Sequence, residues 1–296
     1  MSTFTAVDLS KLPAPDVFEQ LSFEQILAQR VAEFRRFLPE FDALVEAEPV
    51  YKLLQAGAYR ELVLREQFNQ RAKGLFLAYA QHADLDNLAA PFGVTRQQLV
   101  PPDEANNRPA VMESDTDFRR RIQLAPEGLS VAGPEGAYIF HALSADSDVL
   151  DASATSPSPG RVVVTVQARS GDGTPSPALL AKVEAVLLDD NVRPLTDHVS
   201  VAAASILPYA VDAELYTFNG PDAALVIAEA RRRLEVFQRE AHRLGRDLPR
   251  SALIAQLHAE GVQRVVLNAP ATDLDVDRTQ AAWCSGVRIG HAGIHE

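Results

Sequence analysis

The chain has 296 residues, of which 47% are hydrophobic and 23% are charged, and this composition excludes wholesale disorder and a fibrous repeat. The formal net charge of −12 argues against a nucleic acid or an anionic membrane surface as the main partner, because both attract a basic excess. The single Cys284 allows no internal disulfide, and no signal peptide or membrane-spanning run is evident, so we expect folding in a reducing cytoplasm.

The N-terminal residues 1–20 predict an extended arm, and a helical domain is expected over 21–90. Ser22 and Gln25 have the spacing of a capping box, which predicts a helix start. Arg30 occupies one place in the heptad-like series of apolar residues that follows, and Pro39 predicts a break near Leu38. The series alternates steps of four and three residues, which suits packing against another helix; it comprises Phe23, Leu27, Phe34, Phe37, Phe41 and Leu44.

Pro49 predicts the first turn of a second helix, which we expect to run to about Gln81. Its apolar face changes along its length. One stripe consists of Tyr51, Leu54, Ala58 and Leu62, and the other consists of Leu64, Phe68, Ala72, Leu75 and Tyr79. Two interpretations remain open: the helix contacts different partners at its two ends, or both stripes pack inside one helical domain.

Four prolines in 91–113 predict a linker, followed by a middle α+β domain over 114–206 and a C-terminal α+β domain over 207–296. The middle domain is expected to contain helices near Asp115 and after Gly133-Pro134, strands at 149–155, 161–169 and 199–203, and a helix at 177–188. The C-terminal domain is expected to contain strands at 210–218, 262–267 and 281–289. Its helices should run from Gly220-Pro221 to about Arg243 and from Pro249 towards Gly261. The predicted fold class is therefore multidomain α+β.

Asp273, Asp275 and Asp277 resemble the start of a calcium loop. The sixth position is Arg278 where a glycine is needed, and the twelfth is Cys284 where a carboxylate is needed. We therefore expect an edge strand there. His291, His295 and Glu296 lie close together in sequence, and we expect a frayed tail with no dedicated metal site.

The sequence contains no zinc-protease, P-loop or dinucleotide-binding motif, and Gly128–Gly133 is one residue too long for a nucleophile elbow. We accordingly predict a protein that is not an enzyme, with no catalytic, cofactor-binding or metal-binding residues. The triple arginines Arg119–Arg121 and Arg231–Arg233 lie on predicted helices. We treat them as candidate donors of salt bridges between chains.

Several segments in the same order resemble the baseplate J-like family of contractile phage tails and R-type tail-like bacteriocins. The resemblance covers nearly the whole chain and rests on LPAPDVFEQLSFEQILAQR (12–30), AYRELVLREQFN (58–69), PAVMESDTDFRRRIQ (109–123), EGLSVAGPEGAY (127–138), TSPSP (155–159) and AHRLGRDLPRSALIAQLHAEGVQRVVL (241–267).

This resemblance implies a structural wedge subunit assembled in the bacterial host cytoplasm. Two copies and one companion wedge protein, similar to baseplate protein I, would share a helical bundle. The C-terminal domain would contact neighbouring wedges, so that the wedges form a ring around the central hub and spike. The ring would lie near the sheath initiator and would open when sheath contraction is triggered. The expected bundle residues are Phe23, Leu27, Phe34 and Phe37, and those extending the bundle or packing on the next copy are Leu64, Phe68 and Tyr79.

Two alternatives belong to other functional classes. A tail-associated cell-wall hydrolase needs two carboxylates flanking a cleft, which a sequence does not display. A receptor-binding module tends to carry aromatic-rich loops, whereas aromatic residues make up only 7% of this chain and many fall on helical stripes.

Overall fold

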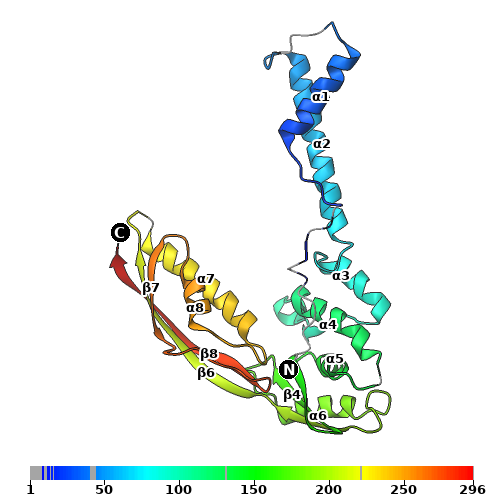
Figure 1. Ribbon diagram of the computed structural model, residues 1–296, viewed down its shortest axis with the longest axis vertical. Helices are drawn as coiled ribbons and strands as arrows, with labels where there is room; N and C mark the ends of the chain where they lie inside the picture. Colours follow the sequence, from blue (N-terminus) through cyan, green and yellow to red (C-terminus); the bar gives the residue numbers. More distant parts are fainter. Residues whose placement is uncertain are drawn as a thin grey trace. The chain divides into compact units, whose positions relative to one another are not determined.

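A computed structural model describes residues 9, 12, 13, 15, 17–40, 45–130, 132–220 and 222–295. Contacts between residues divide the described chain into two compact units. The first unit contains the residues up to Arg96 together with Asp115–Arg119, and the second contains Gln97–Ser114 and Arg120–Glu296. Helices dominate the first unit and small sheets with covering helices make up the second, so the predicted α+β class is confirmed (Figure 1).

The first unit begins with α1 (Phe23–Phe37), which lies against the long helix α2 (Pro49–Lys73) (Figure 1). Ser22 caps α1 as predicted, because its side-chain oxygen accepts a hydrogen bond from the Gln25 amide at 3.4 Å. The helix ends at Phe37, in agreement with the break predicted from Pro39. Phe41 and Leu44 of the predicted heptad lie outside the described residues.

The prediction that α2 continues to Gln81 was wrong. The helix stops at Lys73, and tight turns lead through residues 74–81 to α3 (His82–Ala89). Gly74 stands at this stop, where a Cβ atom would lie 2.5 Å from a carboxylate oxygen of Asp84. A side chain at position 74 would therefore require the Asp84 carboxylate to move, and the periodicity of the apolar residues did not reveal that contact.

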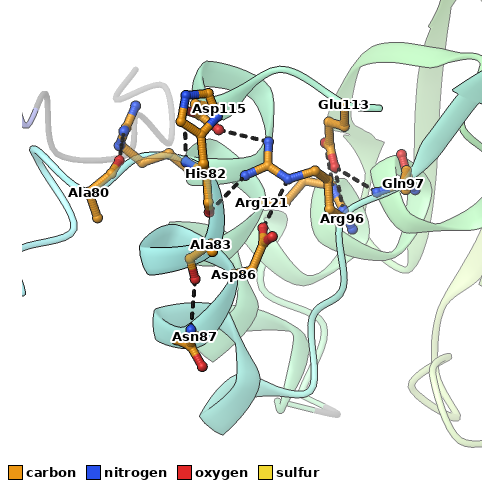
Figure 2. A network of polar contacts seen from close by, with 11 residues as sticks. Ala80, His82, Ala83, Asp86, Asn87, Arg96, Gln97, Glu113, Asp115 and Arg121 are labelled. Carbon is orange, nitrogen blue, oxygen red and sulfur yellow. Dashed lines mark hydrogen bonds and ion pairs between the residues drawn. The ribbon is translucent and has the colours of Figure 1, made fainter. Parts of the chain in front are cut away.

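Arg96 joins α3 to the first turn of α4 (Asp115–Gly128) inside the first unit (Figure 2). Its guanidinium bonds Asp86 at 2.9 Å and Asp115 at 2.8 Å, and it lies 4.7 Å from the ring centre of the fully buried Phe118. Arg119 donates to the carbonyl oxygens of Leu77 and Ala80. A short 3-10 helix, η2 (Ala90–Phe92), completes this part of the unit.

The second unit begins with residues that the sequence assigned to a linker. They form the antiparallel pair β1 (Gln98–Val100) and β2 (Val111–Met112), with η3 (Glu104–Asn106) between them. Directly after β2, Glu113 forms a buried, bidentate ion pair with Arg121 of α4, with hydrogen bonds of 2.8 and 2.6 Å (Figure 2). Glu113 also accepts a hydrogen bond from the Gln97 amide.

The first sheet of this unit has the order β3-β4-β5. Strand β3 (Val149–Ser158) is antiparallel to β4 (Arg161–Ala168), and β4 is parallel to β5 (His198–Ala203) after the crossover helix α6 (Pro177–Leu187). Helix α5 (Glu135–Ala145) packs on β3 and α6. The apolar core between this sheet and its helices includes Leu143, Val164, Val166, Val183 and Leu187.

The second sheet has the order β7-β6-β8. Strand β6 (Ser205–Thr217) pairs antiparallel with β7 (Val262–Ala269) and parallel with β8 (Gln280–Ile294). Alternate residues of β6 are buried under α7 (Ala223–Ala241) and α8 (Arg250–Leu257), and this separate core includes Val211, Leu215, Leu234, Leu253 and Leu257.

The edge strand predicted around Asp273, Asp275 and Asp277 was wrong. Within the described residues this segment makes only an isolated bridge, between Leu248 and Leu274. Asp273 accepts the Arg250 amide at 2.7 Å, and Asp277 accepts the Thr279 amide at 2.7 Å. The two aspartates are therefore used to satisfy nearby backbone donors, which is a common role of aspartate in turns.

Polar contacts join the two sheets of the second unit. Asp151 on β3 is 3% exposed, bonds Arg120 at 2.8 Å, and accepts the backbone amide of Leu244 at 3.1 Å. His242 is also buried, and its Nδ1 donates to the Ala282 carbonyl at 2.7 Å. Gly173 has a φ of +100°, and a Cβ atom there would lie 2.8 Å from Nε2 of His242, so this turn needs glycine.

We expect the second unit to lose stability as the pH falls from about 7 towards 5. Burial lowers the pKa of the His242 imidazole, and Arg243 acts in the same direction. Protonation of the ring is therefore less favourable in the folded state than in the unfolded chain, which takes up a proton below about pH 6.5, so acid favours unfolding. His242→Gln should flatten the dependence of the denaturation midpoint on pH. A residual slope is expected, since burial also lowers the pKa of His141.

The matched control for this prediction is His258→Gln, because His258 is exposed. It should reproduce the pH dependence of the unchanged protein. A His242→Gln protein that loses stability with the same slope between pH 7 and 5 would contradict the assignment.

Candidate assembly interface

The α1–α2 pair carries six of the seven predicted interface residues. On α1, Phe23, Leu27 and Phe34 are half-buried, whereas Phe37 is 74% exposed. The most deeply buried side chain of α1 is Ile26, at 4% exposure, which the predicted heptad omitted. On α2, the buried positions are Ala58, Asn69 and Ala72. The structure therefore directs one side of each helix inward and leaves Phe37 outside.

Arg30, which stands in the heptad series where an apolar residue is expected, forms an ion pair with α2. Its guanidinium contacts Glu61 of α2 at 2.8 Å, and a Cβ atom on Gly57 would lie 3.2 Å from it. Glycine inside a helix costs about 1 kcal/mol relative to alanine, so its presence here fits the close approach of Arg30. The hydrogen bond from Arg30 lowers the pKa of the Glu61 carboxyl, which keeps the pair charged at neutral pH.

The segment before α1 lies along the second half of α2. The Asn69 side chain exchanges two hydrogen bonds with the backbone of Glu19, at 3.2 and 2.9 Å. The ring of Phe18 meets those of Phe76 and Tyr79 edge-on, at 5.8 and 5.6 Å between centroids. Tyr79 is thus half-buried and packs against its own chain. Most of the predicted arm over 1–20 lies outside the described residues.

The remaining predicted residues, Leu64 and Phe68, are 54% and 59% exposed on α2. The sequence reasoning missed their exposed neighbours Leu53, Tyr59 and Val63. For Leu53 the missed signal is a heptad-like spacing that leads to Leu64 and that polar residues interrupt, whereas Tyr59 and Val63 lie outside this series. Large apolar side chains that stay exposed close together on one helix pair are typical of an interaction surface.

Outside the α1–α2 pair, the residues that the structure describes give little evidence of a chemical site. Among the described residues, no group of three or more histidine, cysteine or acidic side chains is arranged to hold a metal ion. None of the helices described is both long and apolar enough to cross a bilayer. Arg119, Arg120 and Arg121, treated above as possible donors to other chains, each have partners in their own chain. Arg232 likewise pairs with Glu229 at 2.7 Å.

Comparison with known proteins agrees with the resemblance seen in the sequence. The Baseplate J-like N-terminal domain matches residues 46–103, and the Baseplate J-like central domain matches residues 130–203. Baseplate protein J of Escherichia phage P2 is 46% identical over 299 residues, covering 98% of this chain and 99% of that protein.

Among solved structures, a chain of the anti-feeding prophage baseplate, determined by cryo-EM and 6-fold symmetrised, aligns with a TM-score of 0.40 and 14% identity. The alignment covers 60% of this chain and 44% of that chain. From the two matching domains and the full-length similarity to the phage P2 protein, we conclude that this chain belongs to the baseplate J-like family.

Proposed function

We propose that this chain is a structural wedge subunit of the baseplate of a contractile tail or a tail-like bacteriocin. The observation that carries the proposal is the 46% identity to Baseplate protein J of phage P2 over nearly the full length of both chains. Family membership supports a structural baseplate role and gives no support to a cell-wall hydrolase. The finer assignment of wedge, ring and partners rests on the surfaces described below.

The exposed side of the α1–α2 pair supports a shared helical bundle. Phe37, Leu53, Leu64 and Phe68 are each more than half exposed. A single chain leaves this apolar area in water, whereas a bundle with a second copy and the companion wedge protein would bury it. Phe23, Leu27 and Phe34 are already half-buried in the single chain, so they offer less surface to a partner than these four residues do.

The far end of the sheet β7-β6-β8 supports the proposed contact with neighbouring wedges. Three apolar side chains that are about half exposed or more lie where β6 and β8 end and α7 begins: Phe218, Leu225 and Ile294. Thr217 of β6 pairs in register with Ile294 of β8, which places Phe218 and Ile294 at the same end of the sheet. Assembly in the host cytoplasm, near the central hub and sheath initiator, follows from the same proposal.

The structure allows a direct test of the bundle. Phe68→Asp should lower the affinity for the companion wedge protein at least about tenfold, because a carboxylate would be buried without a partner. Since Phe68 is exposed in the single chain, the melting temperature of the isolated protein should change little. The measurement is the dissociation constant of the purified full-length proteins by calorimetry.

The matched control is Leu129→Asp, which changes an exposed leucine of the second unit and should leave the affinity as it is. If the unchanged chain fails to bind the companion, the proposed function is wrong. If Phe68→Asp binds as tightly as the unchanged chain, Phe68 does not belong to the interface.

A further inference from the structure

The outer side of α2 presents a stripe of exposed residues at heptad-like spacing. We name this set the outer stripe, and it consists of Leu53, Ala56, Arg60, Leu64, Gln67 and Arg71. At 100° per residue, all six fall within about 80° around the helix axis, and Phe68 lies beside them. The steps of three and four residues are those of a helix that packs lengthwise against another helix.

Two arginines interrupt this stripe, and neither forms an ion pair within the described residues. The other α2 arginine, Arg65, bonds Glu61 at 2.6 Å and Glu19 at 3.1 Å. Glu61 is already shared between Arg30 and Arg65, and Glu66 points to another side of the helix, where it bonds Gln70. Arg60 and Arg71 therefore give the outer stripe a positive charge that its own helix does not neutralise.

The α1–α2 contact shows how this fold accommodates an arginine within a helical seam. Arg30 lies in the apolar series of α1, and Glu61 of the facing helix supplies its carboxylate. A helix that covers the outer stripe removes water from Arg60 and Arg71 in the same way. Burying an arginine without a carboxylate partner is unfavourable, so the covering helix must bring acidic side chains.

We propose that the outer stripe binds an amphipathic α-helix of the companion wedge protein that carries carboxylates opposite Arg60 and Arg71. The two arginines are 11 residues apart along α2, so the carboxylates should be spaced about 16 Å apart along the partner. This inference rests on the proposed function and adds the charge of the helix that α2 recognises.

Charge also distinguishes the companion from a second copy of this chain. Two outer stripes packed on each other would bring like charges together, which disfavours that pairing. On α1, Glu24 and Glu33 are exposed, but at 100° per residue they lie on opposite sides of the helix, and the exposed Arg35 lies beside Glu24. Neither α1 nor α2 of a second copy therefore presents the continuous acidic face that the outer stripe requires, which points to an acidic helix of a different chain.

The test uses the full-length chain and the full-length companion. Arg60→Glu combined with Arg71→Glu should weaken binding at least about tenfold at 100 mM NaCl. The affinity of the unchanged chain should fall as salt is raised to 500 mM, and that of the double variant should not. Arg60→Lys with Arg71→Lys should bind within about threefold of the unchanged chain, because it keeps both charges.

The matched control is Arg161→Glu, which reverses an exposed arginine of β4 and should leave binding unchanged. Self-association of the chain alone, followed by sedimentation velocity, should be the same for all variants. Equal binding by the glutamate double variant overturns the inference. Loss of self-association with intact companion binding also overturns it, because the second copy would then occupy the stripe.

These outcomes separate the inference from the proposed function. If the unchanged chain does not bind the companion, both the inference and the proposed function are wrong. If Phe68→Asp abolishes binding while the glutamate double variant binds normally, the bundle stands and only the acidic partner helix is ruled out. Circular dichroism of each variant verifies that the helix content of the chain is unchanged.

Discussion

Replacing Glu113 with alanine is expected to lower the free energy of unfolding of the second unit by about 3–5 kcal/mol, because it removes the carboxylate that pairs with a buried arginine. The side chains of Arg121 and Glu113 are only 6% and 2% exposed and meet through two short hydrogen bonds. The substitution also removes the acceptor of the Gln97 amide. Urea denaturation followed by the fluorescence of the single Trp283, which lies in the second unit, measures the change.

Two further variants make this prediction specific. Glu229→Ala breaks the exposed pair with Arg232 and should lower the free energy of unfolding far less than Glu113→Ala, because water and salt screen an exposed pair. Glu113→Leu combined with Arg121→Met removes both charges and should be considerably more stable than Glu113→Ala alone, since apolar residues of similar size can replace a buried pair. Equal losses for Glu113→Ala and Glu229→Ala would show that burial of the first pair contributes nothing.

Phe118→Ala should destabilise the first unit by about 3–5 kcal/mol, the range measured for large aromatic residues removed from protein cores. The Phe118 side chain is fully buried, and the Arg96 guanidinium lies over its ring. The substitution therefore opens a cavity and removes the surface on which Arg96 rests while that residue bonds Asp86 and Asp115. Hydrogen exchange of the amides in residues 82–96 should become correspondingly faster.

Phe218→Ala is the matched control, since the same side chain is 48% exposed there and belongs to the second unit. It should change stability by less than about 1 kcal/mol. If exchange in residues 82–96 stays as slow in Phe118→Ala as in the unchanged chain, the proposed role of this phenylalanine in the first unit is wrong.

Local sequence signals were sufficient wherever the decisive interaction is short-range. Ser22 and Gln25 are three residues apart, and Pro39 acts on its immediate neighbours, so both ends of α1 were predicted. The crossover helix before β5 was placed correctly, because the proline at its first residue and its periodicity are local too. The same holds for the α+β class, since the apolar period changes from helical to alternating after the first third of the chain.

Long-range contacts decided the rest. Asp84 of α3 approaches Gly74 just after the end of α2, and the role of Asp273 depends on the Arg250 amide, 23 residues away. The sequence also did not determine which apolar residues of the predicted interface face inward. That depends on the Arg30–Glu61 pair and the Phe18 contacts, which join segments far apart in sequence.

The sequence by itself determined the family, the fold class and the existence of an apolar helical region. Only the tertiary structure decided that Ile26 turns inward, that Phe37 and Phe68 remain in water, and that Arg60 and Arg71 stay without a carboxylate among the described residues. The physical reason is that burial and charge pairing depend on which chemical groups meet in space. Heptad spacing shows which residues share one side of a helix, but it does not show which side the chain covers with its own atoms.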